Sequence, residues 1–196
     1  MARITLLNLI DDVNKALKAE AYFAALSLVL TIPDICSLAE YGNCLMDQNG
    51  KKQNRYIVWF DEYIGQHEQN PSDKNSPSPM PYLSGEVVYQ LRCKFLHEGH
   101  PNIDKNRISV ESNKIDKFTL VIQKSNEFDI YADSASLEND NNRRTYDVNV
   151  QRLCMIICMT AKKYYETNKD KFSFEDFNVF DWDEATNYFR KDGDSE

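Results

Sequence analysis

Arg92 and His97 lie five residues apart in the segment LRCKFLHEG. The imidazole of a histidine gains or loses a proton near neutral pH, which suits general acid–base catalysis. A guanidinium beside it suits the binding of a phosphate, or of the charge that develops on a phosphate in a transition state. Together the two side chains would suffice in principle for metal-independent RNA cleavage, in which a 2′-hydroxyl attacks the adjacent phosphate.

The spacing of this pair does not by itself bring the two side chains together. Five residues of an ideal α-helix advance about 7.5 Å and turn through about 140°. Gly99 and Pro101 predict that the helix ends just after His97, and a last turn that loosens there would let Arg92 and His97 converge. The alternative is a histidine that complements the helix dipole and an arginine at the surface, because R-x4-H often arises by chance.

Metal and cofactor chemistry have little support in the sequence. His97 and His100, together with Glu98 or Asp104, would be the candidates for a divalent ion, and His67 falls in a polar segment. No H-E-x-x-H pattern, glycine-rich phosphate loop or G-x-S-x-G elbow is present. We expect no metal and no cofactor, and we expect the carboxylates of FDEY and DWDE to be surface groups and helix caps.

Composition indicates one cytoplasmic domain. The chain has 196 residues, 42% of them hydrophobic, and no pattern of a secretory signal. Its longest apolar stretch, residues 21–32, is too short to span a bilayer. The cysteines are odd in number and form no C-x-x-C pair, and Cys154 and Cys158 lie among apolar residues, which favours reduced, buried thiols over a metal site.

The net charge of −8 works against non-specific binding of nucleic acid, because affinity there comes from neutralising phosphates. An RNA contact would need a local basic patch. The alternative interpretation of each short basic cluster is an ordinary solvent-exposed surface. The candidate clusters are Lys51, Lys52 and Arg55; Arg143 and Arg144; and Lys162 and Lys163.

Apolar residues at three- and four-residue spacings predict helices in the N-terminal half. A first helix begins near residue 4 and runs, with a bend, to residue 30. Pro33 breaks it, Asp34 can cap a second helix over 35–43, and Gly42 suggests its end. A third helix over 54–67 has an aromatic inner face that we assign to the core: Tyr56, Trp59, Phe60 and Tyr63.

The C-terminal half begins with a polar loop over 66–81, which we expect to be flexible. Ser84 caps a fourth helix that carries the Arg–His pair. Alternating residues predict a β-hairpin over 116–133. A helix over 148–167 is apolar nearly all round, which suits the centre of a bundle. Short helices anchored by Phe174, Phe177, Phe180 and Trp182 follow, with a frayed tail at 190–196. The fold class expected is an all-α, up-down bundle of about five main helices with a small inserted β-hairpin.

The segment VVYQLRCKFLHEG follows a helix-rich half and precedes a long apolar helix. In this it resembles the HEPN superfamily, small all-helical bundles marked by an R-x(4–6)-H motif. The match carries over to Arg92 and His97 only. The residue after the arginine, often Asn, Asp or His in that superfamily, is Cys93 here.

The resemblance implies a single HEPN-like domain over 1–196 and two rival functions. One is a homodimeric, metal-independent endoribonuclease of a toxin–antitoxin or phage-defence system, with RNA as substrate and a cognate antitoxin protein as partner. His97 would act as acid or base, and Arg92 would stabilise the phosphate charge. The other is a non-catalytic module that recognises a nucleotide, RNA or protein partner. Neither function involves a membrane.

Overall fold

The computed structural model describes residues 2–3, 5–69, 81–124, 134–138, 143–172, 178–179 and 182, and it is mostly helical. The α-helices and the π-helices η1 and η3 that continue them are α1 (Leu6–Lys18), α2 (Tyr22–Val29), α3 (Ile32–Tyr41), α4 (Arg55–Phe60), η1 (Asp61–Gly65), α5 (Gln66–Glu68), α6 (Gly85–Cys93), η3 (Lys94–Glu98) and α7 (Val150–Thr167). Single 3₁₀ turns are η4 (Lys105–Arg107), η5 (Glu111–Asn113) and η6 (Lys169–Lys171). The strands are β1 (Ala2–Arg3), β2 (Leu45–Met46), β3 (Lys52–Gln53), β4 (Lys117–Val121), β5 (Ser134–Glu138), β6 (Arg143–Asn149) and β7 (Asn178–Val179).

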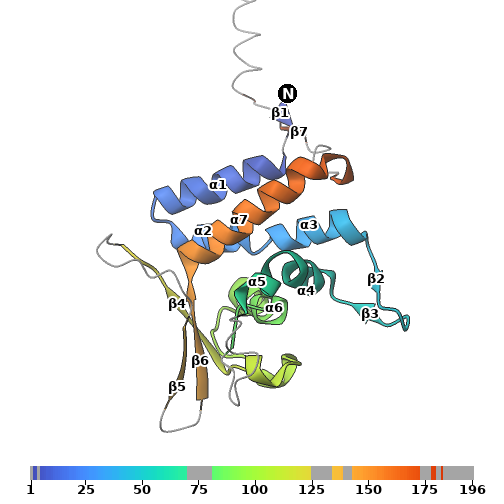
Figure 1. Cartoon of the computed structure of the whole chain (residues 1–196). Helices are drawn as coiled ribbons and strands as arrows, with labels where there is room; N and C mark the ends of the chain where they lie inside the picture. The colour runs from blue at the N-terminus through green and yellow to red at the C-terminus, as the bar shows by residue number, and fades with distance from the viewer. Residues whose placement is uncertain are drawn as a thin grey trace, which may run out of the picture.

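The helices form two layers around one core (Figure 1). α1, α2, α3 and α7 make one layer, and the α4–η1–α5 segment lies with α6 in the other. α4 packs against both α3 and α6. The largest fully buried side chains include, as predicted, most of the aromatic face of the third helix: Tyr56, Trp59 and Phe60.

The first predicted helix is two helices. Residues 19–21 separate α1 from α2, and Glu20 has a φ of +56°. A left-handed non-glycine residue is unfavourable within a right-handed helix, so the chain turns here rather than bending. α1 then packs directly on α2.

α3 begins earlier than predicted. Pro33 lies in its first turn, where a missing N–H costs nothing, and Thr31 precedes the helix in the capping position. The prediction that Asp34 caps the helix is therefore wrong, since Asp34 lies inside its first turn and its carboxylate reaches another element. Gly42, with a φ of +67°, ends the helix as predicted.

α2 and α3 together span Tyr22–Tyr41, the one stretch of the described chain long and apolar enough to cross a membrane. Its mean hydropathy is 1.7, and 44% of the window is buried inside the protein. The stretch is broken between the two helices, and it contributes Ala25, Leu26 and Ile32 to the core. Packing in the core accounts for part of its apolar composition, while Phe23 and Leu38 are exposed.

The β-structure differs from the predicted hairpin. β4 confirms its first strand, while residues 125–133 lie outside the described part. β4 pairs in parallel with β6, with Phe118 opposite Tyr146, and the antiparallel partner of β6 is β5. The sheet order is therefore β4-β6-β5 (Figure 1), and the hairpin lies one segment later than predicted. The residues of β6 were predicted as the end of a polar segment and the start of the long helix at Val148.

Two further strand pairs extend the β-content beyond a single hairpin. β2 pairs with β3 in a short arm that connects α3 to α4, and β1 pairs with β7. β7 forms where the sequence predicted short helices, and Trp182, predicted to be an anchor, is 70% exposed. The other predicted anchors and the 190–196 tail lie outside the described residues, as does most of the 66–81 loop.

α7 confirms the predicted long helix to within two residues of its start. The side chain of Asn149 caps it by accepting a hydrogen bond from the Arg152 N–H. The helix is not enclosed on all sides as predicted, since Met155 and Met159 are 46% and 66% exposed. One apolar face of α7 therefore lies at the surface.

Candidate active site

A π-helical turn brings Arg92 and His97 together. α6 continues into η3 without a break, and the Gly99 N–H donates to the Lys94 carbonyl across five residues at 2.7 Å. This wider turn replaces the α-helical spacing that would hold the two side chains apart. Arg92 Nη1 lies 3.4 Å from His97 Nε2, so the predicted convergence is confirmed.

Gly99 ends the π-turn as the sequence predicted. It adopts the left-handed conformation, with φ +67° and ψ +21°, which glycine allows without strain. Lys94 is buried within the turn and pairs with Glu98 at 2.6 Å. His97 itself is exposed, so the imidazole is accessible to a ligand.

The start of α6 is fixed against α4 and η1. Ser84 caps the helix through a hydrogen bond from the Val87 N–H, as predicted, and Asp61 Oδ1 accepts one from the Gly85 N–H at 2.6 Å. A Cβ at position 85 would lie 2.4 Å from the Ile57 carbonyl, so only glycine allows this approach. Burial raises the pKa of Asp61, and the Gly85 N–H opposes that rise.

Asp34 is the site residue that the sequence analysis missed. Its Oδ2 lies 2.6 Å from Arg92 Nη2, which joins the first turn of α3 to the end of α6. Burial alone would lower the pKa of Arg92, but the Asp34 carboxylate raises it above its usual value. An acidic residue beside a proline at a helix start looks like a cap, so its sequence context gave no sign of this contact.

Two tyrosine rings complete the surroundings of Arg92. The guanidinium carbon lies 5.9 Å from the centroid of the Tyr56 ring and 6.0 Å from that of Tyr89, within cation–π range. The two rings lie 5.4 Å apart and tilted. Arg92 is thus held by a carboxylate at one edge and by aromatic rings at its side.

Some polar atoms around Arg92 are buried without a partner. Within the described part of the chain, neither Arg92 Nε nor the Tyr56 hydroxyl has a hydrogen-bond partner. Burial, followed by the negative charge of Asp34, raises the pKa of Tyr56 well above its usual value. His97 Nε2 can only accept from the guanidinium, because arginine has no acceptor. In this arrangement the proton of a neutral His97 is on Nδ1.

A cleft of about 400 Å³ opens next to Asp34 and Tyr89. Its remaining lining comes from the β2–β3 arm and the start of α4: Asn43, Leu45, Lys52, Gln53, Asn54 and Arg55. One of the three predicted basic clusters therefore contributes two cations to a cleft that is also lined by two residues in contact with Arg92, while Arg92 and His97 are not among its lining residues.

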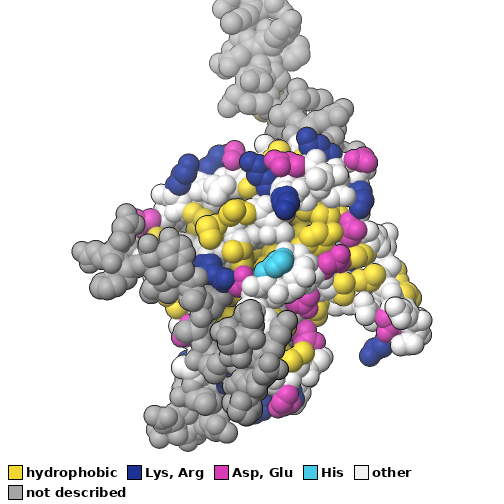
Figure 2. Space-filling model, viewed as in Figure 1, with side chains coloured by type: hydrophobic (Ala, Val, Ile, Leu, Met, Phe, Trp, Pro, Cys, Tyr) yellow, Lys and Arg dark blue, Asp and Glu magenta, His cyan; other side chains and the backbone are white. Residues whose placement is uncertain are grey.

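The other two basic clusters lie elsewhere. Arg144 donates to the Ser112 carbonyl at 2.8 Å, so its guanidinium is part of the fold. Lys162 and Lys163 are exposed on α7. On the face shown in Figure 2, basic side chains lie mostly over α1 and α7 and alternate with acidic ones.

Within the described part of the chain, the remaining histidines do not form a metal site with their neighbours. His100 Nε2 lies 3.0 Å from Glu98, and His67 is exposed on α5. Among the described residues, no three His, Cys, Asp or Glu side chains come together in a way that could hold a metal ion.

The predicted burial of Cys154 and Cys158 is confirmed, and Cys36 is buried as well. Burial raises the pKa of both Cys154 and Cys158 to about 12. Cys93, directly after Arg92, is a free, half-buried thiol. The buried thiols act as small apolar side chains of the core.

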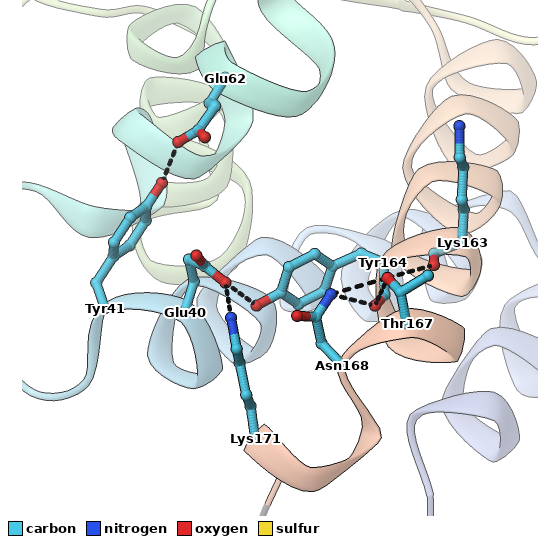
Figure 3. A network of polar contacts seen from close by, with 8 residues as sticks. All are labelled: Glu40, Tyr41, Glu62, Lys163, Tyr164, Thr167, Asn168 and Lys171. Atoms are coloured by element: carbon cyan, nitrogen blue, oxygen red, sulfur yellow. Dashed lines mark hydrogen bonds and ion pairs between the residues drawn. The ribbon is translucent and has the colours of Figure 1, made fainter.

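A second polar cluster lies at the far end of α3 (Figure 3). Glu40 accepts hydrogen bonds from the Tyr164 hydroxyl at 2.5 Å and from Lys171 at 2.8 Å. Next to it, the Tyr41 hydroxyl donates to Glu62 at 2.6 Å. These contacts join α3 to α7, η6 and η1.

No protein-family model, curated protein or solved structure matches the chain.

Proposed function

We propose that the protein is a metal-independent endoribonuclease in which Arg92 and His97 act on one phosphodiester of an RNA strand. The observation that supports this most is the π-turn, which brings a guanidinium nitrogen to 3.4 Å from an exposed imidazole nitrogen. π-turns of this kind are rare and occur frequently at functional sites.

The chemistry follows from the two groups. When substrate binds, the Arg92 contact at Nε2 is exchanged for one from the 2′-hydroxyl; neutral His97 then takes that proton through Nε2, and the 2′-oxygen attacks the adjacent phosphorus. A new P–O2′ bond forms and the P–O5′ bond breaks, which yields a 2′,3′-cyclic phosphate and a 5′-hydroxyl. The Arg92 guanidinium stabilises the charge on the phosphate oxygens in the transition state.

The leaving 5′-oxygen needs a proton from the side opposite to the attack. His97 of one chain cannot serve both sides of an in-line displacement. A homodimer that joins two α6–η3 ends supplies a second His97, in its protonated form, as the general acid. We therefore include a homodimer in the proposal.

Asp34 acts as a positioning residue in this mechanism. It binds Nη2, which turns the Nη1 edge of the guanidinium toward His97. Arginine has five N–H donors, so one contact to Asp34 and one to His97 leave donors for a phosphate.

The alternative is a non-catalytic module that binds a nucleotide, RNA or protein partner. One observation favours it: the Asp34 carboxylate lies 2.6 Å from Arg92 and offsets its positive charge, which weakens attraction for a phosphate. In this case Arg92 and His97 would hold a ligand or a subunit contact without chemistry.

RNA cleavage in EDTA tests the proposal. Purified wild-type protein and the His97→Ala variant are incubated with total RNA and tRNA. The matched control is His100→Ala, which removes another exposed histidine, three residues away, whose side chain is 48% exposed. Wild type and His100→Ala should cleave and leave cyclic phosphate ends. His97→Ala should be slower by about 10²–10⁴-fold, the usual contribution of a general acid–base group.

Two results would contradict the ribonuclease. One is equal cleavage by His97→Ala and wild type, and the other is no cleavage by well-folded wild-type protein, which moves the proposal to the binding module. Sedimentation measurements on the same samples test the homodimer. Growth arrest on expression, relieved by a coexpressed neighbouring gene, tests an antitoxin partner in the cytoplasm.

A further inference from the structure

The cleft beside Asp34 and Tyr89 has the size and the chemistry of a ligand site. Its volume of about 400 Å³ falls within the range of small-molecule pockets. The β2–β3 arm forms one wall, and α3, α4 and α6 supply the others. Arg92 lies next to the cleft, because both Asp34 and Tyr89 contact its guanidinium.

The charges in the cleft favour an anion. Within the described part of the chain, neither Lys52 nor Arg55 has an acidic partner, and Arg55 Nε is buried with no hydrogen-bond partner. The carboxylate in the cleft, Asp34, is already paired with Arg92. The cleft therefore has two uncompensated cations in a protein whose net charge is −8. A buried guanidinium nitrogen without a partner is the group that a phosphate oxygen satisfies.

The other walls favour a nucleobase next to that phosphate. Tyr89 is half-buried, and the centroid of the Tyr56 ring lies 5.4 Å from that of its own ring, with the two rings tilted by 60°. Base stacking on such rings does not depend on sequence. The side-chain amides of Asn43 and Gln53 offer both donors and acceptors, which pair with base edges. A small anion would use the cations but not the ring and the amides.

We propose that this cleft binds one nucleotide of a single-stranded RNA, with its phosphate on Lys52 and Arg55 and its base on Tyr89. The proposal rests on the proposed function in one respect, since it takes the nucleotide to flank the phosphate that Arg92 and His97 cleave. A base in a duplex is stacked and paired, so only an unpaired strand can place it in the cleft.

The test measures binding apart from cleavage. Fluorescence anisotropy follows a labelled eight-nucleotide RNA in the His97→Ala background. Lys52→Gln/Arg55→Gln removes both cations of the cleft. Lys51→Gln/Arg107→Gln removes the same charge from exposed positions outside it, and circular dichroism checks the fold of each variant.

The cleft variant should bind at least about 10-fold more weakly than the control, and its salt dependence should decrease by about one released ion per lost contact. Tyr89→Leu should weaken binding about 5- to 100-fold through lost stacking. AMP should compete only at concentrations well above those of the RNA, because it lacks the neighbouring phosphates.

Equal binding by the cleft variant and its control would overturn the proposal, and so would duplex RNA that binds as tightly as the single strand. No binding of RNA by the His97→Ala protein would overturn it too. The two proposals can fail separately. If RNA binds through Lys52 and Arg55 but wild type does not cut it, the nucleotide site stands and the ribonuclease is overturned. If the cleft variant cuts RNA as well as wild type does, the ribonuclease stands and the nucleotide site is overturned.

Discussion

α3 carries an acidic residue near each end, and the two have different surroundings. Asp34, in the first turn, pairs with Arg92 of α6 at 2.6 Å. Glu40, in the last turn, pairs with Lys171 at 2.8 Å and accepts a hydrogen bond from Tyr164. Each carboxylate thus pairs with one cation from a distant element. Tyrosine rings from α4 and α6 lie beside the Asp34 pair, and tyrosine rings from α7 and η1 lie beside the Glu40 pair.

The difference lies in the polar groups next to each carboxylate. Trp59 Nε1, whose ring contacts that of Tyr164, is also buried without a partner in the described structure, but it makes no hydrogen bond to Glu40. The Tyr164 hydroxyl donates to Glu40, whereas the Tyr56 hydroxyl and Arg92 Nε are buried without a partner in the described structure. Unpaired buried groups cost stability, so a fold keeps them where they serve another purpose. We infer that the Glu40 end fastens the helices together, while the Asp34 end holds polar groups ready for a ligand.

The largest expected effect separates the two cations. Arg92→Ala should lower the rate of RNA cleavage by about 10²–10³-fold, as loss of a transition-state donor does. Lys171→Ala should leave the rate unchanged, because its partner Glu40 lies in the last turn of α3, at the end opposite the Asp34–Arg92 pair. Cleavage assays below the melting temperature of each variant check this. Equal losses of rate would show that both ion pairs act through the fold alone.

Replacement of Tyr164 should lower stability, whereas replacement of Tyr56 should not. Tyr164→Phe removes a hydrogen bond to a carboxylate and should lower the free energy of unfolding by about 1.5–3 kcal/mol. Tyr56→Phe removes a buried hydroxyl without a partner, and it should leave stability unchanged or raise it by about 1 kcal/mol. Urea unfolding of both variants checks this. A clear loss of stability in Tyr56→Phe would mean that its hydroxyl has a partner after all.

Much of the helical structure could be predicted from apolar spacing and terminal signals. Ser84, Gly42 and Gly99 mark helix ends where the structure has them. The strands were harder, because β6 follows a polar segment and its parallel partner β4 is distant in sequence. Such long-range pairing depends on the whole sheet and is not visible in a local pattern.

The site itself was predicted only in part. The pair Arg92 and His97 was found from residue types, and its convergence depended on a loosened turn that spacing cannot establish. Asp34 was missed because its partner, Arg92, lies 58 positions away in the sequence. Lys52 and Arg55 were noted as basic residues, but only the arm between α3 and α4 shows that they share a cleft with Tyr89.

The smallest expected effect concerns the pH dependence of the Glu40 end. The hydrogen bond from Lys171, followed by that from Tyr164, lowers the pKa of Glu40 below its usual 4.5. A carboxyl whose pKa is lowered by folding stabilises the protein above its ordinary pKa, and this contribution is lost as the pH falls through the folded pKa. Glu40→Gln retains an acceptor for Tyr164 and loses only the charge.

Glu40→Gln should therefore lower the free energy of unfolding at pH 7 by about 0.2–1 kcal/mol, the range of partly exposed ion pairs. The difference from wild type should shrink below pH 4.5 and vanish once Glu40 is protonated in both states. Urea unfolding at a series of pH values measures it, with Glu166→Gln as a control, because that exposed carboxylate on α7 has no ion-pair partner in the described part of the chain. A difference that persists in acid would mean that Glu40 stabilises the fold through packing and not through its charge. At the Glu40 end, Tyr164 and not the Lys171 ion pair would then stabilise the contact between α3 and α7.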